Sequence, residues 1–297
     1  MSVDWSFGGL WPYEPRWHST PEGRIHYIDE GPRDGQPVVL LHGNPTWGFL
    51  YRNFVDPLVA AGHRVIAPDF LGFGRSDKPT DPENYRTLAH VRRLSGLLDS
   101  LDLHGSVLVP QDWGGLALAW AVANPDRVSK LFILNTTMHN PDHFEIPFAL
   151  RLFRLPGVGE LMVKGLGLFH RLFLFRIGVV HRERLTPNVK HAYLAPHVTW
   201  GSRTGVLVFP REIPVGPDSH VAGFTTQVEI GLERTFRNHP VQIVWAMKDP
   251  AFTADLLDKW LKTFPQAKVV RLADAGHYLQ EDAHERIVPE LLKFLAT

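Results

Sequence analysis

An apolar run that ends at an acid and two glycines constrains this chain more than any other feature. Residues 107–115 read Val-Leu-Val-Pro-Gln-Asp-Trp-Gly-Gly, and a helical pattern follows as far as Ala123. The first four residues are typical of a buried strand, and the glycines permit a sharp change of direction. We therefore expect Asp112 at a tight turn between a strand and a helix, with its side chain at the edge of a sheet.

A carboxylate at such a turn has a distinct chemistry. An aspartate with an ordinary pKa of about 3.9 is ionised at neutral pH. Backbone N–H groups at the start of a helix are expected to lower the pKa of Asp112 further. Such a nucleophile suits attack on an alkyl carbon or an epoxide, which gives an ester that water must later cleave. The competing interpretation is that Asp112 only caps the helix that begins at Trp113.

Short β-branched runs alternate with helical patterns over the first 135 residues. This alternation predicts an α/β fold with a mostly parallel central sheet flanked by helices. The expected strands are Arg24–Ile28, Pro37–Leu41, Arg64–Ala67, Ser106–Val109 and Lys130–Leu134, followed by Val241–Trp245 and Lys268–Leu272. The expected helices are Phe49–Ala60, Tyr85–Leu101, Gly114–Ala123, Thr253–Thr263 and Ala283–Leu295.

Residues 137–224 interrupt this alternation. They hold no clear strand pattern and are rich in Leu, Phe, Arg and Pro. A linker would lack so many large apolar residues, so we expect a helical cap over a core domain formed by residues 1–136 and 225–297. We assign the Leu- and Phe-rich stretch from Leu150 to Phe175 to the packing face of the cap rather than to a lipid-binding helix.

Composition narrows the classes of partner. The 297 residues hold 31 Lys and Arg against 31 Asp and Glu, and no basic tract predicts a nucleic acid or membrane partner. The chain has no cysteine, which excludes disulfides and thiol nucleophiles. Its sixteen histidines follow no metal-binding spacing, so we expect no metal. With no secretion signal at the N-terminus, we expect a cytoplasmic protein that acts on a small molecule.

Two further candidates follow late strands. Asp249 comes after the run that ends at Trp245, and His277 comes after the run that ends at Leu272. Nucleophile, acid and histidine thus occur in the chain order of the α/β-hydrolase fold. His277 can polarise a water, and Asp249 can fix its tautomer and stabilise the imidazolium. Taken singly, each residue also fits an ordinary turn.

The loop after the strand 37–41 supplies donors for the same site. The backbone N–H groups of Asn44 and Trp113 can form an oxyanion hole at Asp112. The amide of Asn44 and the indole N–H of Trp113 can solvate a departing halide, although neither can protonate a leaving alkoxide. The plainer interpretations are a turn residue for Asn44 and a packing aromatic for Trp113.

These segments resemble those of the haloalkane dehalogenases of the α/β-hydrolase superfamily. The matching segments are residues 42–47 (HGNPTW), 68–79 (PDFLGFGRSDKP), 111–115 (QDWGG), 209–214 (FPREIP) and 274–277 (DAGH). The combination is specific, whereas the Asp-Trp-Gly-Gly segment alone also fits epoxide hydrolases. Pro110 is a departure, because the superfamily usually has a small residue two places before the nucleophile.

The resemblance implies Asp112 as nucleophile, His277 as water-activating base, and Trp113 and Asn44 as halide-binding residues. Because Asn135 occupies the other position that carries the acid in this family, Asp249 is left as the acid. This set is similar to the third subfamily, whose members tend to self-associate. The implied reaction takes a small apolar halogenated substrate to alcohol, halide and a proton without a cofactor.

Three alternatives remain open. An epoxide hydrolase commonly uses two cap tyrosines to protonate the ring oxygen, and this cap has one, Tyr193. A fluoroacetate-type dehalogenase is expected to carry arginine where Trp113 stands. A non-catalytic binding protein on the same scaffold is the third alternative, since fold alone does not guarantee activity.

Overall fold

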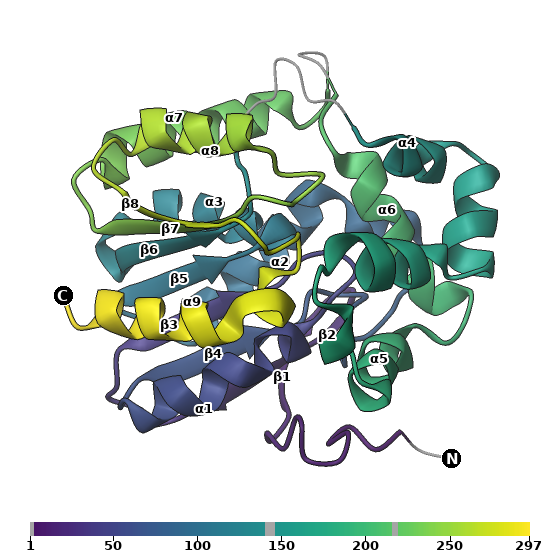
Figure 1. Cartoon of the computed structure of the whole chain (residues 1–297), viewed down its shortest axis with the longest axis horizontal. Helices are drawn as coiled ribbons and strands as arrows, with labels where there is room; N and C mark the ends of the chain where they lie inside the picture. Colours follow the sequence, from purple (N-terminus) through teal and green to yellow (C-terminus); the bar gives the residue numbers. More distant parts are fainter. Residues whose placement is uncertain (1–2, 140–145, 216–218) are drawn as a thin grey trace.

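A central sheet organises the computed structural model, which describes residues 3–139, 146–215 and 219–297. The described residues form one eight-stranded sheet in the order β1-β2-β4-β3-β5-β6-β7-β8 (Figure 1). β1 pairs antiparallel with β2, and β2 pairs antiparallel with β4. The six strands β4, β3, β5, β6, β7 and β8 are all parallel to one another. The predicted mostly parallel sheet is confirmed.

The strand bounds agree closely with those expected. The strands are β1 (Arg16–Thr20), β2 (Gly23–Glu30), β3 (Pro37–Leu41), β4 (Arg64–Pro68), β5 (Ser106–Pro110), β6 (Val128–Leu134), β7 (Val241–Ala246) and β8 (Lys268–Leu272). Sequence analysis missed β1, which reads Arg-Trp-His-Ser-Thr and is largely exposed at the sheet edge. A strand without a buried face has no apolar alternation to reveal it.

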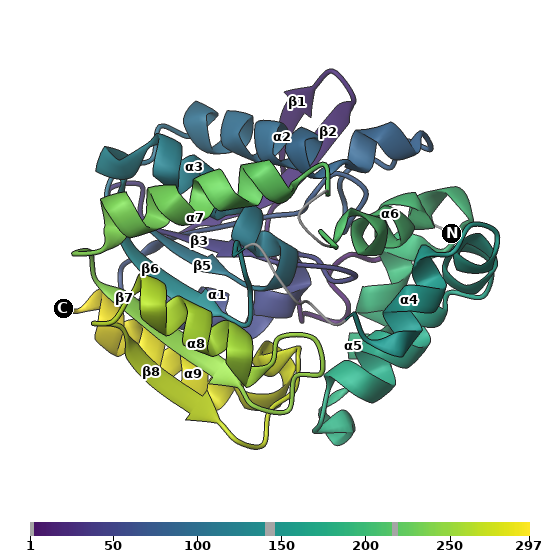
Figure 2. The same cartoon turned by 90° about the horizontal axis from the view of Figure 1, so that it is seen from above.

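Helices cover both faces of the sheet, as predicted. These helices are α1 (Arg52–Ala60), α2 (Thr87–Ser100), α3 (Ala117–Ala123), α7 (Ala222–Phe236), α8 (Ala254–Thr263) and α9 (Leu279–Leu295). α1 packs with α9 on one face, while α2, α3 and α7 lie together over the other (Figure 2). None of the described helices is both long and apolar enough to cross a membrane.

The chain between β6 and β7 leaves the sheet and forms further helices. We call residues 146–215 the cap segment, which contains α4 (Phe148–Arg154), α5 (Pro187–Leu194), α6 (Thr204–Glu212) and the π-helical turns η5 (Glu160–Gly165) and η6 (Phe169–Gly178). The indole of Trp47 donates to the carbonyl of Ala192 and ties this segment to the core. The predicted boundary at residue 224 falls inside α7, so the domain division stays a prediction.

Two glycines allow β3 and β5 to bring their following loops together. A Cβ at Gly43 would lie 2.1 Å from Oδ1 of Asp112, and a Cβ at Gly114 would lie 2.1 Å from the carbonyl oxygen of Leu41. No side chain fits at such distances without a shift of the surrounding backbone. The turn that holds Asp112 therefore depends on glycine at both positions.

The Gly114→Ala substitution tests this dependence. We expect it to lower the free energy of unfolding by about 1–3 kcal/mol, because the added methyl group must displace the β3 backbone. Gly96→Ala is the matched control, since a Cβ there would lie 3.7 Å from His18 on the exposed side of α2. It should raise stability by about 0.5–1 kcal/mol. Equal unfolding free energies of both variants in urea titrations would contradict the close approach.

Candidate active site

Asp112 lies at the turn that the sequence predicts. β5 ends at Pro110, and the 3-10 turn η3 (Asp112–Leu116) leads directly into α3. Asp112 has φ of +50°, a left-handed conformation that is uncommon outside glycine and concentrates at functional sites. Its N–H donates to the carbonyl of Asn135 at 2.9 Å, and the hydroxyl of Thr136 donates to its carbonyl at 2.5 Å. These two bonds from the chain after β6 hold the turn.

The two oxygens of the Asp112 carboxylate have different surroundings. Oδ1 accepts the backbone N–H of Asn44 at 2.7 Å, and the Trp113 N–H also bonds to the carboxylate. Oδ2 lies 3.6 Å from Nε2 of His277. Gln111 precedes η3 and makes no side-chain cap. The Asp112 carboxylate binds the N–H of Asn44 as well as that of Trp113, so capping of the helix alone does not account for its contacts. One oxygen is thus held by backbone donors, and the other is left facing the histidine.

His277 and Asp249 lie together at the ends of β8 and β7. Nδ1 of His277 lies 2.9 Å from Oδ2 of Asp249. The other oxygen of Asp249 accepts the N–H groups of Ala251 at 2.8 Å and Phe252 at 3.1 Å. The Phe252 ring stacks on the imidazole at a centroid distance of 5.5 Å. The imidazole is therefore fixed in orientation, with Nδ1 toward the acid and Nε2 toward Asp112.

Burial and charge shift the pKa values of this site. Burial raises the pKa of Asp112 above its usual value, although His277 and the two backbone N–H groups oppose that effect. The predicted lowering of this pKa is therefore wrong, because loss of water outweighs the helix-start donors. Burial also opposes charge on His277, but the nearby carboxylates of Asp249 and Asp112 outweigh it and raise the pKa of the imidazole.

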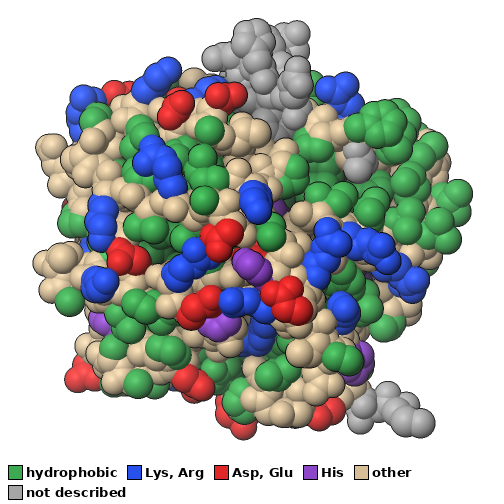
Figure 3. Space-filling view, viewed as in Figure 1, with side chains coloured by type: hydrophobic (Ala, Val, Ile, Leu, Met, Phe, Trp, Pro, Cys, Tyr) green, Lys and Arg blue, Asp and Glu red, His purple; other side chains and the backbone are tan. Residues whose placement is uncertain are grey.

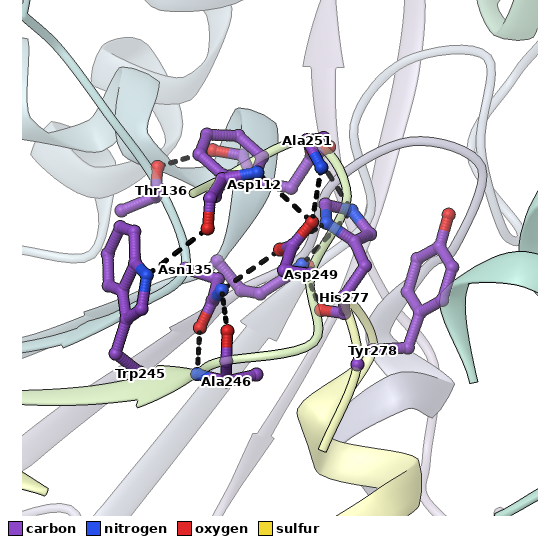
Figure 4. Close-up of polar contacts among 12 residues, drawn as sticks. Asp112, Asn135, Thr136, Trp245, Ala246, Asp249, Ala251, His277 and Tyr278 are labelled. Carbon is purple, nitrogen blue, oxygen red and sulfur yellow. Dashed lines mark hydrogen bonds and ion pairs between the residues drawn. The ribbon is translucent and has the colours of Figure 1, made fainter. Parts of the chain in front are cut away.

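Sequence reasoning missed the part that Asn135 plays. It noted only that an amide at this position cannot be the acid. In the structure, Nδ2 of Asn135 donates to Oδ2 of Asp249 at 2.9 Å, and its Oδ1 accepts the N–H of Ala246 at 2.7 Å. Figure 4 shows the Asp249 carboxylate between this amide and the imidazole of His277. Asn135 thus orients the acid, which only the pairing of β6 with β7 reveals.

The side chains of Asn44 and Trp113 are both positioned by α6 of the cap segment. Nδ2 of Asn44 donates to the carbonyl of Val206 at 3.2 Å, and the Trp113 ring stacks on Phe209 at 4.5 Å. Among the described residues, Nδ2 of Asn44 donates to no other acceptor, and the buried Oδ1 of Asn44 has no partner. An amide nitrogen carries two hydrogens, so the second one is available to a ligand in the cavity, beside the indole N–H of Trp113.

These residues line a mostly apolar cavity between the sheet edge and the cap segment, with about 920 Å³ of empty space when the part open to solvent is included. Its lining includes Asn44, Asp112, Trp113 and His277 together with the apolar side chains of Leu116, Met138, Leu150, Phe169, Phe173, Ile213, Val221 and Phe252. Among the described residues, no tyrosine lines it. The hydroxyl of Tyr193, the cap tyrosine noted in the sequence, instead donates to Glu281 on α9.

Comparisons with known proteins agree with this geometry. The alpha/beta hydrolase fold family matches residues 36–284. The chain is 36% identical to a cis-3-alkyl-4-alkyloxetan-2-one decarboxylase of Shewanella oneidensis, over 96% of this chain and 89% of that protein. It is 34% identical to a haloalkane dehalogenase of Psychrobacter cryohalolentis, over 92% of this chain and 88% of the relative. The crystal structure of haloalkane dehalogenase DbeA from Bradyrhizobium elkani superposes with a TM-score of 0.85 at 30% identity, over 95% and 97% of the two chains.

Titration of the His277 ring by NMR tests the electrostatics of the site. We expect its pKa above 6.5, and Asp249→Asn should bring it below 6.5 because burial then prevails. Asp112→Asn should lower the pKa by less than Asp249→Asn does. His139, whose pKa burial lowers to about 3, is the internal reference and should stay neutral throughout. A His277 pKa that is unchanged by Asp249→Asn would contradict the assigned pairing.

Proposed function

Because the chain belongs to the alpha/beta hydrolase fold family, within the group that includes the haloalkane dehalogenases, we propose that it hydrolyses carbon–halogen bonds. The products are an alcohol, a halide ion and a proton. The observation that carries this proposal is the carboxylate of Asp112, which lines an apolar cavity together with the indole of Trp113 and the side-chain amide of Asn44. A cytoplasmic location and self-association remain predictions from the sequence.

The first step is nucleophilic displacement at the carbon that bears the halogen. Oδ2 of Asp112 attacks from the side opposite the halogen, and the carbon–halogen bond breaks as the aspartyl ester forms. The indole N–H of Trp113 and the amide of Asn44 stabilise the departing halide. Both donors are neutral, and they act in a mostly apolar cavity, where such interactions are stronger than in water.

The second step is hydrolysis of the ester. His277 takes a proton from water through Nε2, and the resulting hydroxide attacks the carbonyl carbon of the ester. The negative charge then develops on Oδ1, which already accepts the backbone N–H of Asn44, and the Trp113 N–H bonds to the same carboxylate group. The imidazolium of His277 returns its proton to the departing oxygen, so the alcohol leaves with the former Oδ2 of Asp112. The carboxyl group, which now holds one oxygen from water, releases the remaining proton.

Ester formation also prepares His277 for its role. In the free protein the charge of Asp112 helps to raise the pKa of His277. Esterification removes that charge and lowers the pKa of His277, which favours the neutral imidazole, the form that can take a proton from water. Asp249 then stabilises the imidazolium that forms, and Asn135 holds Asp249 in place. The chain thereby couples the basicity of the histidine to progress of the reaction.

The site offers little for epoxide hydrolysis. Ring opening of an epoxide needs an acid near the oxygen, and no tyrosine is among the described residues that line the cavity. A binding protein without activity would not require the nucleophile, base, acid and donors in this mutual geometry. Dehalogenation therefore accounts for these residues better than epoxide hydrolysis or ligand binding without catalysis.

One observation favours a second candidate function. The relative from Shewanella oneidensis that is 36% identical is named for decarboxylation of cis-3-alkyl-4-alkyloxetan-2-ones, not for dehalogenation. Loss of carbon dioxide from such a four-membered lactone leaves an alkene. An apolar cavity of about 920 Å³ with a carboxylate nucleophile has the chemistry to admit this substrate class as well.

Product analysis with matched substrates separates the two functions. The purified protein is incubated with 1-bromo- and 1-iodoalkanes, and in parallel with a cis-3-alkyl-4-alkyloxetan-2-one of similar chain length. The dehalogenase proposal predicts halide and alcohol in equal amounts from the first set. Trp113→Phe removes the indole N–H. We expect it to reduce halide release by about tenfold or more, because one hydrogen bond to the negatively charged halide is lost.

Asp112→Asn should abolish either activity and shows that turnover uses this site. Asn124→Ala is the control, because the Asn124 amide bonds only within α3 and its following turn. Alkene and carbon dioxide without halide release from any haloalkane would favour the decarboxylase. No turnover of either set would refute both.

A further inference from the structure

The outer side of the cap segment carries most of the exposed apolar side chains. Fourteen large hydrophobic residues of the described chain are exposed, and nine of them lie between Phe148 and Val215, a stretch that is under a quarter of the sequence. Figure 3 shows hydrophobic side chains gathered over the region of α4, with Lys and Arg side chains beside them. An apolar surface concentrated in this way usually has a partner.

Part of this surface is a compact group of apolar and basic side chains. The Lys164 ammonium lies 5.3 Å from the centre of the Trp200 ring. Gly165 lies between Trp200 and Leu161, because a Cβ on it would be 3.4 Å from the first side chain and 3.5 Å from the second. Arg203 donates to the carbonyl of Lys164 and thereby joins the loop of Trp200 to η5.

We call this surface the cap face. It consists of Leu155, Val158, Leu161, Lys164, Leu166, Arg171 and Trp200. Sequence analysis assigned the whole stretch from Leu150 to Phe175 to packing. That assignment describes Phe153, Val163 and Phe169, which are buried, but Leu161 and Leu166 of the same stretch remain exposed.

Charge is strongly uneven between the cap segment and the rest of the chain. Residues 148–200 hold eight Lys and Arg against two Asp and Glu, a net charge of +6. The whole chain has a formal charge of zero, so the remainder carries −6. One of the two acids, Glu160, is paired with Arg211 at 2.7 Å. The balanced total, which predicted no anionic partner, conceals an excess of positive charge in residues 148–200, of which Lys164 and Arg171 belong to the cap face.

We propose that the cap face docks on an anionic lipid surface. Exposed Leu and Trp side chains enter the boundary between headgroups and acyl chains, and Lys and Arg beside them attract anionic lipids. A second copy of this chain is the less suitable occupant, since a symmetric pair would bring the Lys164 and Arg171 side chains of one copy toward those of the other. The docked protein lies on the bilayer and does not span it.

Lipid docking at the cap face would place the bilayer next to the wall of the cavity. Phe169 and Phe173 of η6 line the cavity, while Arg171 between them is exposed on the cap face. The same short segment thus forms the wall of the cavity and part of the proposed lipid contact. An apolar substrate dissolved in a bilayer would be concentrated beside that wall.

Vesicle sedimentation tests the proposal directly. The full chain is mixed with phosphatidylcholine vesicles, or with vesicles in which about a third of the lipid is phosphatidylglycerol. We expect binding to the anionic vesicles, weak binding to the zwitterionic ones, and a marked loss of binding between about 0.05 M and about 0.5 M salt. Equal partition into both kinds of vesicle, or no binding to either, would overturn the proposal.

Paired variants locate the contact. Leu161→Ser with Trp200→Ser, and separately Lys164→Glu with Arg171→Glu, should each lower partition by about tenfold or more. Leu88→Ser with Ile230→Ser is the apolar control, since both side chains are 52% exposed and lie outside the cap segment. Lys262→Glu on α8 is the charge control. Both controls should bind vesicles as the unaltered chain does.

Measurements of folding and of oligomeric state complete the experiment. Far-UV circular dichroism and thermal unfolding establish that each variant is folded, and the single changes replace any pair that is not. Light scattering after size-exclusion chromatography gives the oligomeric state. If the cap-face variants change oligomeric state while vesicle binding is unaltered, the surface is an interface between copies. If the controls lose vesicle binding as strongly as the cap-face variants, the surface is misassigned.

Discussion

The hydrogen bonds from the Asn44 and Trp113 backbone to Asp112 are the interaction on which the rest of this structure depends. They orient the carboxylate: the Asn44 N–H holds Oδ1, and Oδ2 is the oxygen that faces His277. Their geometry requires the loop after β3 and the turn after β5 to approach without side chains at Gly43 and Gly114. The same N–H groups serve first to orient the nucleophile and later to stabilise the oxyanion that develops on Oδ1.

The cap segment is part of this site and not merely a cover. α6 supplies the carbonyl of Val206 to the Asn44 amide and the ring of Phe209 to the Trp113 indole. α6 is in turn anchored to the core, because the buried carboxylate of Glu212 accepts the N–H and hydroxyl of Thr87. Both proposed halide donors are thus oriented by a helix whose own place is fixed by a buried hydrogen-bonded acid.

Sequence patterns could place the parallel strands, Asp112, Asp249 and His277, because buried strands and the turns after them carry strong local signals. They could not give the direction of the Asp112 pKa shift, which depends on how much water the completed fold removes. The partnership of Asn135 with Asp249 depends on two strands that are far apart in sequence. Similarly, Asp69 in the matching segment 68–79 is structural: it accepts the N–H groups of Gly48 and Arg75, which no local pattern reveals.

The central claim is that an oxygen of Asp112 forms a covalent bond to carbon during turnover. Single-turnover reaction in water enriched in oxygen-18, with protein in excess over haloalkane, tests it most directly. The account predicts unlabelled alcohol, since its oxygen comes from the carboxylate, together with one heavy oxygen in the peptide that contains Asp112. Labelled alcohol in the first turnover, with no label in that peptide, would contradict the account.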